Sequence, residues 1–242
     1  QNRIMSAMRW IPWVSREDRF QVKSHGDPFV TGVSRRVHVT LESDVDVRWG
    51  TSGRRIGVDG HKRIFLAENV RDFNFTAARD YKLRTGTSID GRTRIKVYTR
   101  TISSSTIMTW ARKALDYYSR KVGQYPYPTL TISESSGSYA MESPALVWLP
   151  AYYASYKIPF VLSHEIAHQW FYGVVGNDQT TNPFLDEAMS EFLARSMFGF
   201  RASRCDTKRL DLSMYSYTPS CYYEQVYVQG SSFLNNLRQD MG

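Results

Sequence analysis

The sequence of 242 residues lacks most features that would mark a membrane, fibrous or repetitive protein. It has no low-complexity tract, no internal repeat and no apolar run long enough to cross a membrane. Histidine is scarce, with five residues in the whole chain. Hydrophobic residues make up 42% and charged residues 22%, which indicates an ordinary globular protein with ample sequence for a buried core.

Cysteine is rarer still, because Cys205 and Cys221 are the only two. They flank a predicted loop and could form one disulfide, but the sequence leaves open whether they pair or remain free thiols. No signal peptide is visible, and the chain begins with Gln1, which is compatible with removal of a leader. We therefore favour an extracytoplasmic or secreted location.

The formal charge of +8 would suit a nucleic-acid-binding protein, but no nucleic-acid motif accompanies it. Basic residues are scattered in pairs such as Arg54-Arg55 and Arg120-Lys121 instead of forming one block. A solvated basic surface explains this pattern, so we expect no nucleic-acid partner.

Hydrophobic periodicity predicts β structure in the first third and a mixture of strands and helices after it. Val37, Val39 and Leu41 alternate with polar residues, as in a half-buried strand. Asp59-Gly60 and Asp90-Gly91 are hairpin signals. The later predicted elements are a strand over 92–100, a helix over 103–123, strands over 129–133 and 140–149, and a helix starting over 231–241.

The segment 164–168, His-Glu-Ile-Ala-His, carries the strongest chemical signal. Residues four apart share one face of a helix, so His164 and His168 can bind one metal ion while Glu165 lies beside it. Apolar residues surround the motif on both sides, which predicts a largely buried helix. A buried His-Glu-His cluster would be costly without a metal.

A second predicted helix supplies a third ligand. Eighteen residues separate His168 from Glu187, enough for the chain to turn and return. Asn182 suits the N-cap and Pro183 the first helical position. Glu191, one turn beyond Glu187, could accept a hydrogen bond from a metal-bound imidazole or could be a solvated helix charge.

Two imidazoles, one carboxylate and an open fourth position are typical of catalytic zinc, so the residues predict one zinc ion. This set leaves no role for the cysteines as ligands. Glu165 is placed to act as general base on the attacking water and to carry the proton to the leaving group. The predicted reaction is metal-assisted hydrolysis of a peptide bond.

At these residues the chain resembles the aminopeptidase N family of zinc metallopeptidases, particularly its bacterial members. Residues 168–179 (His-Gln-Trp-Phe-Tyr-Gly-Val-Val-Gly-Asn-Asp-Gln) and 183–188 (Pro-Phe-Leu-Asp-Glu-Ala) are similar to the family's sequence around its ligands. Residues 139–143 (Tyr-Ala-Met-Glu-Ser) resemble its Gly-Ala-Met-Glu-Asn signature. The resemblance implies that Ala140 and Met141 lie along the substrate backbone and that Glu142 holds the free α-amino group.

Residues 224–230 resemble the family's tyrosine segment, which implies that Tyr227 stabilises the oxyanion. The resemblance also implies an α+β fold in which residues 1–88 end an N-terminal β domain. Residues 89–242 would form a thermolysin-like zinc catalytic domain with a mixed sheet, cut off before a helical domain. The expected partners are peptides with a free N-terminus.

Two alternatives stay open. Tyr139 and Ser143 depart from the family signature, so the chain could be a zinc endopeptidase. It could also be a binding module that retains the fold without catalysis. The intact Glu165 argues against the second alternative, because degenerate members tend to lose the base or a ligand. For Glu142, the competing interpretation is an ordinary edge-strand charge.

Overall fold

The computed structural model describes residues 3–8, 10–11 and 32–242, which have an α+β fold. The described chain divides into two compact units. Unit 1 comprises the described residues up to Gln169, and unit 2 comprises residues 170–242. Because the chain divides here after Gln169, the predicted domain boundary near residue 88 lies within unit 1 and stays a prediction.

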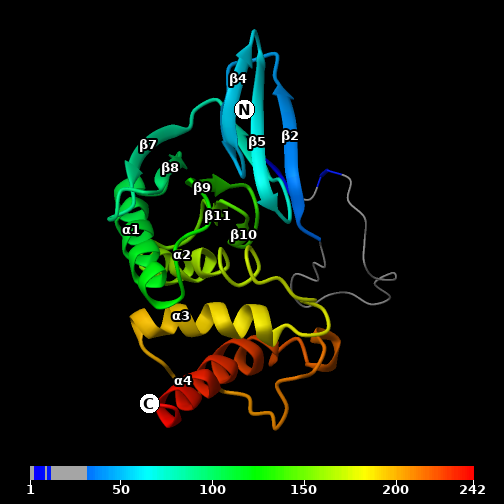
Figure 1. Ribbon diagram of the computed structural model, residues 1–242, viewed down its shortest axis with the longest axis vertical. Coiled ribbons are helices and arrows are strands. Elements are labelled where there is room, and N and C mark those ends of the chain that lie inside the picture. The colour runs from blue at the N-terminus through cyan, green and yellow to red at the C-terminus, as the bar shows by residue number, and fades with distance from the viewer. Residues whose placement is uncertain (1–2, 9, 12–31) are drawn as a thin grey trace. The chain divides into compact units, whose positions relative to one another are not determined.

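Unit 1 contains three sheets among the described residues (Figure 1). Two three-stranded sheets have the orders β1-β6-β3 and β2-β5-β4, and a five-stranded mixed sheet has the order β10-β11-β9-β8-β7. The strands are β1 (Met5–Ala7), β2 (Ser34–Glu42), β3 (Arg48–Thr51), β4 (Arg54–Asp59), β5 (Lys62–Val70), β6 (Phe75–Ala78), β7 (Lys82–Thr87), β8 (Arg94–Thr99), β9 (Thr129–Ser135), β10 (Met141–Ser143) and β11 (Leu146–Pro150).

The two predicted hairpins are confirmed. Asp59 ends β4 and pairs with Lys62 of β5, and Gly60 between them has a φ of 53°. Gly91 lies between the paired strands β7 and β8 with a φ of 75°. Glycine suits both turns because it reaches positive φ without a Cβ clash.

The predicted strand over 140–149 is wrong in one respect, because the segment is a hairpin. β10 and β11 are antiparallel, and Ser143 pairs with Leu146. Pro144 and Ala145 form the connection, and Ala145 has a φ of 60°. Proline has no N–H for a ladder hydrogen bond, which explains the interruption.

Two helices pack on the mixed sheet in unit 1 (Figure 1). Helix α1 (Ser104–Lys121) begins as predicted, since Ser103 accepts a hydrogen bond from the N–H of Thr106 at its N-terminus. It contacts β7 and β8, whereas α2 (Ile158–Ala167) contacts β10 and β11, and the helices contact each other. The large apolar side chains buried in this core include Ile95, Leu130, Ile132, Leu146, Ile107, Leu115, Ile158 and Leu162.

Unit 2 is helical in its described residues. Its elements are η1 (Phe184–Ala188, a π-helix), α3 (Met189–Phe198), η2 (Met214–Ser216, a 3₁₀-helix), η3 (Tyr223–Gln229, a π-helix) and α4 (Gly230–Asp240). The predicted C-terminal helix is confirmed as α4, which packs against α3 (Figure 1). Among the described residues, no helix is long and apolar enough to cross a membrane.

Candidate metal centre

The two motif histidines and the glutamate between them lie at the C-terminal end of α2. His164 and Glu165 are in its last turn, and His168 is the C-cap. All three side chains are buried. The imidazole ring centroids are 4.8 Å apart, and the two Nε2 atoms are separated by 3.1 Å. The predicted sharing of one helix face is therefore confirmed for the histidine pair.

This spacing suits a zinc ion. Two nitrogen ligands each about 2.0–2.1 Å from a tetrahedral zinc lie roughly 3.3 Å apart. The 3.1 Å between the Nε2 atoms of His164 and His168 is close to that value. Imidazole nitrogen is also a preferred donor for zinc, so the pair fits the predicted metal in both geometry and chemistry.

Helix α2 is held in place from α1. The Tyr118 hydroxyl donates a hydrogen bond to the Ser163 carbonyl oxygen over 3.0 Å, and both residues are buried. The Ser163 hydroxyl in turn donates to the Pro159 carbonyl oxygen at 2.8 Å. Ser163 immediately precedes His164, so the α1 contact anchors the turn that carries the motif.

A buried glutamine links the end of α2 to the β10–β11 hairpin. The Gln169 Nε2 donates to the Ser143 carbonyl oxygen at 3.0 Å, and its Oε1 accepts from the Ala145 N–H at 2.8 Å. Gln169 has no exposed surface. One side chain therefore fixes the hairpin relative to the metal helix, a role that the sequence reasoning missed although Gln169 directly follows His168.

Ser143, which departs from the family signature, is the centre of a buried polar cluster. Its hydroxyl lies 3.0 Å from that of Ser52 and accepts a hydrogen bond from the Asn74 side-chain amide at 2.9 Å. Ser52 directly follows β3 and Asn74 directly precedes β6, so the two lie side by side at one end of this strand pair. Serine at this position therefore ties β10 to the N-terminal strands, which gives the departure a structural reason.

Glu142, the predicted amine anchor, lies on β10, the edge strand of the mixed sheet. It pairs with Val147 and is only 7% exposed, which is unusual for an edge-strand carboxylate. Burial therefore disfavours the interpretation of Glu142 as an ordinary solvated charge. Met141 begins the same strand, and Ala140 immediately precedes it.

Tyr153 is a second residue that sequence reasoning missed. Its hydroxyl oxygen accepts a hydrogen bond from the Ala140 N–H at 3.2 Å. Burial raises the Tyr153 pKa, and the negative charge of Glu165 contributes to the rise. Tyr153 thus contacts the predicted substrate strand and also experiences the electrostatic field of the predicted base. With sixteen tyrosines in the chain, no sequence signal distinguished it.

In unit 2, the predicted third ligand Glu187 lies on the π-helix η1 and is buried. The predicted N-cap at Asn182 is wrong by one residue, because Pro183 occupies the N-cap. The Asn182 side-chain amide instead donates to the Thr181 hydroxyl at 2.9 Å. π-Helical turns are rare and occur frequently at functional sites, which suits a ligand-bearing segment.

Glu191, on α3 of unit 2, is only 1% exposed, so the interpretation as a solvated helix charge is wrong. Its carboxylate accepts hydrogen bonds from the Arg195 guanidinium at 2.7 Å and from the Tyr223 hydroxyl at 3.1 Å. Burial raises the pKa of Tyr223 to about 12, and the negative charge of Glu191 adds to this effect. The predicted hydrogen bond from a metal-bound imidazole to Glu191 stays a prediction.

Tyr227 lies on the second π-helix, η3, and is half-buried. The segment 224–230 does not end in a turn, because Gly230 directly continues the helix as the first residue of α4. Gly230 has an ordinary helical φ of −59°. Its need for glycine is steric, since an added Cβ would lie 2.7 Å from the Ala188 Cβ of η1.

The predicted site residues are thus distributed between the two units. Unit 1 carries His164, Glu165, His168 and Glu142, and unit 2 carries Glu187, Glu191 and Tyr227. Within each unit these side chains are held on defined elements. Their assembly into one centre stays a prediction.

The fold is similar to that of solved M1 zinc metallopeptidases. An M1 zinc metallopeptidase from Deinococcus radiodurans superposes with a TM-score of 0.63 at 17% identity, covering 86% of this chain and 52% of its own. A two-domain M1 zinc metallopeptidase, solved as a glutamate-to-alanine mutant with L-arginine, gives a TM-score of 0.64 at 17% identity, covering 86% of this chain and 52% of its own.

The chain therefore spans about half the length of these neighbours, 52% in both cases. No protein-family profile and no curated protein matches the sequence. At 17% identity the likeness demonstrates a shared fold. The finer description of the catalytic domain as thermolysin-like stays a prediction.

Proposed function

We propose that the protein is a zinc-dependent peptidase that removes N-terminal residues from peptides. The observation that carries this proposal is the buried end of α2, where the Nε2 atoms of His164 and His168 lie 3.1 Å apart with Glu165 between them in sequence. The M1 zinc metallopeptidase fold supports the same class of reaction.

His164, His168 and Glu187 would hold one zinc ion, with a fourth position left for water or substrate. When bound, zinc supplies Lewis acidity, which makes water more acidic and polarises a carbonyl group. Glu165 would accept a proton from the water that attacks the scissile carbonyl and later give that proton to the leaving amine. Glu191 would orient a ligand imidazole by accepting its second N–H.

Selection of the N-terminus would come from β10. An edge strand can accept an extended peptide as a further strand, so Ala140 and Met141 would align the substrate backbone. The Glu142 carboxylate would then hold the substrate ammonium group through a charge-assisted hydrogen bond. The Tyr227 hydroxyl would donate a hydrogen bond to the oxyanion that develops from the scissile carbonyl oxygen.

The test compares matched substrates with free and blocked N-termini. Purified protein is assayed for bound zinc and for hydrolysis of alanyl- and leucyl-aminomethylcoumarin and of their N-acetylated forms. We expect one zinc per chain and cleavage of the free substrates only. Glu142→Gln should raise KM for the free substrates by about 10-fold or more, because it removes a charge-assisted hydrogen bond of roughly 1.5–3 kcal/mol.

Glu42→Gln is the matched control, since Glu42 is an exposed carboxylate at the end of β2, and it should leave the kinetics unchanged. Equal cleavage of free and acetylated substrates would instead identify an endopeptidase. Zinc-free protein without turnover would favour a binding module that retains the fold.

A further inference from the structure

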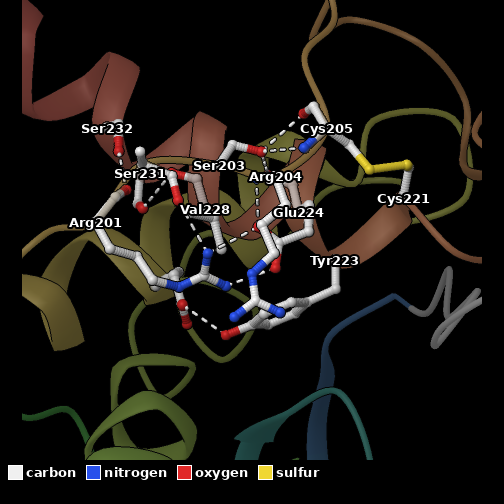
Figure 2. Close-up of polar contacts among 12 residues, drawn as sticks. Arg201, Ser203, Arg204, Cys205, Cys221, Tyr223, Glu224, Val228, Ser231 and Ser232 are labelled. Atoms are coloured by element: carbon white, nitrogen blue, oxygen red, sulfur yellow. Dashed lines mark hydrogen bonds and ion pairs between the residues drawn. A yellow bond between two sulfur atoms is a disulfide. The ribbon is translucent and has the colours of Figure 1, made fainter.

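A short segment of unit 2 runs along η3 and forms several hydrogen bonds with it. We call residues 201–207 the brace. They follow α3 in the chain, and η3 (Tyr223–Gln229) lies beside them. Figure 2 shows the polar contacts between the two segments, with Glu224 of η3 at their centre.

Glu224 receives four hydrogen bonds from the brace. The Arg201 guanidinium donates to both carboxylate oxygens, at 2.7 and 2.8 Å, and the Arg204 N–H donates to the carboxylate at 3.0 Å. The Ser203 hydroxyl donates to the Glu224 carbonyl oxygen at 2.8 Å. A two-pronged arginine–carboxylate pair fixes direction as well as distance, so the first turn of η3 is held in one orientation.

Further along η3, two glutamines bind the other half of the brace. The Gln225 side-chain amide donates to the Asp206 carbonyl oxygen at 3.1 Å. Gln229 makes a pair of bonds to the Thr207 backbone, accepting from its N–H at 3.0 Å and donating to its carbonyl oxygen at 2.7 Å. The brace therefore contacts η3 at its beginning and at its end.

A disulfide closes the arrangement covalently. Cys205 belongs to the brace, and Cys221 lies two residues before η3, with their Cα atoms 5.7 Å apart (Figure 2). The chain between them forms a loop that contains η2. The disulfide therefore links the residues just before η3 to the brace, the same segment that binds Glu224.

A π-helix benefits from such support because its i→i+5 pattern is rarely adopted in proteins. Nothing in the composition of η3 (Tyr-Glu-Gln-Val-Tyr-Val-Gln) favours this geometry over an α-helix. A change from π to α pattern would rotate every later side chain about the helix axis. The direction of Tyr227 therefore depends on which pattern η3 adopts.

Tyr227 lies in the middle of the braced segment. Its ring packs against Tyr223 at a centroid distance of 4.9 Å and against Tyr222 at 5.9 Å. Tyr223 is itself anchored through its hydroxyl to Glu191 at 3.1 Å. Tyr222 and Tyr223, the two residues directly before Glu224, thus connect the orientation of Glu224 to the Tyr227 ring.

We propose that Glu224, held by the brace, is a positioning residue for Tyr227, because it maintains the π-helical course of η3 and so the direction of the Tyr227 side chain. The inference rests on the proposed function for its consequence in catalysis. Its structural part, the dependence of Tyr227 on the brace, can be measured without turnover.

The experiment uses Glu224→Gln, which keeps the side-chain size but removes the charge that Arg201 binds. Arg201→Lys is the second variant, since lysine keeps the charge without the two-pronged geometry. Asp211→Asn is the matched control, because Asp211 forms a similar ion pair with Arg209 at 2.8 Å but is 68% exposed in the nearby loop. Each protein is assayed for kcat and KM, and 3-fluorotyrosine at position 227 reports its surroundings by ¹⁹F NMR.

We expect Glu224→Gln and Arg201→Lys each to lower kcat by about 10- to 100-fold with KM changed less than about twofold, as for a misplaced catalytic group. The ¹⁹F signal should shift or broaden in both, and the control should match the parent in both measurements. Unchanged kcat and an unchanged ¹⁹F signal in Glu224→Gln and Arg201→Lys would overturn the inference.

The two proposals fail in different ways. If the parent protein has no peptidase activity, the proposed function fails, but a ¹⁹F shift confined to Glu224→Gln and Arg201→Lys still supports the positioning of Tyr227. If the ¹⁹F signal moves while kcat stays the same, the brace positions Tyr227 and the catalytic role of Tyr227 is wrong.

Discussion

The end of α2 in unit 1 and the π-helices of unit 2 hold their predicted site residues by different means. Helix α2 lies on a sheet and against α1, and a single buried glutamine, Gln169, links it to the β10–β11 hairpin. Segment η3 is held by one ion pair and several hydrogen bonds from the brace, and a disulfide joins the brace to Cys221 just before η3. The first arrangement relies on an apolar core and the second on polar cross-links.

The difference has consequences for substitutions. In unit 1 the positioning residues are fully buried, so their loss should be costly to folding as well as to the site. In unit 2 the Arg201–Glu224 ion pair of the brace is partly exposed, so its loss should change geometry more than global stability, whereas the disulfide also stabilises the fold by restricting the unfolded chain. Four variants separate these effects, in order of decreasing size.

Glu165→Gln tests whether unit 1 carries the chemistry itself. Removal of a general base should lower kcat by about 10²- to 10⁴-fold. Bound zinc and the midpoint of thermal unfolding should stay the same, because glutamine preserves the shape of the side chain. Turnover within about threefold of the parent would exclude Glu165 as the base.

The double variant Cys205→Ser with Cys221→Ser tests the covalent part of the brace. A disulfide between cysteines 16 residues apart should contribute about 3 kcal/mol to the free energy of unfolding, by restricting the unfolded chain. Urea denaturation of the variant and the parent measures the difference. A loss below about 0.5 kcal/mol would mean that the polar bonds hold η3 without the disulfide.

Gln169→Leu tests the link between α2 and the hairpin. It leaves the Ala145 N–H and the Ser143 carbonyl oxygen buried without this partner, which should cost about 2–3 kcal/mol of unfolding free energy. Gln124→Leu is the control, because exposed Gln124 also makes two side-chain hydrogen bonds. Equal losses in the two variants would argue against a special role for burial.

The smallest effect is expected from the pH dependence of the brace. The Arg201 guanidinium lowers the pKa of Glu224 to about 2 from an ordinary value of 4.5. The carboxylate therefore stabilises the fold above pH 4.5, and this contribution is lost as the pH falls from 4.5 toward 2.

Glu224→Gln should flatten the stability profile in this acidic range only, by less than about 1 kcal/mol for a partly exposed ion pair. Urea denaturation at several pH values measures the profile. Identical slopes for the variant and the parent would show that Glu224 titrates as an ordinary carboxyl group.

Local sequence signals predicted much of the fold. The hairpins at Gly60 and Gly91, the helix capped by Ser103 and the C-terminal helix follow from turn chemistry, capping and periodicity. The break of the 140–149 strand has a local signal in Pro144, which the strand prediction overlooked. No local signal distinguishes the π-helices from α-helices, because that geometry depends on neighbouring segments.

The spacing of His164, Glu165 and His168 by itself determined that two imidazoles share one face of a helix, because four residues span about one helical turn. The buried partners of that helix were decided only by the tertiary structure. Gln169 and Ser143 form hydrogen bonds to residues distant in sequence. The brace likewise holds η3 through contacts between residues distant in sequence. Such contacts depend on how the helices and strands pack together, and a local sequence pattern does not determine that packing.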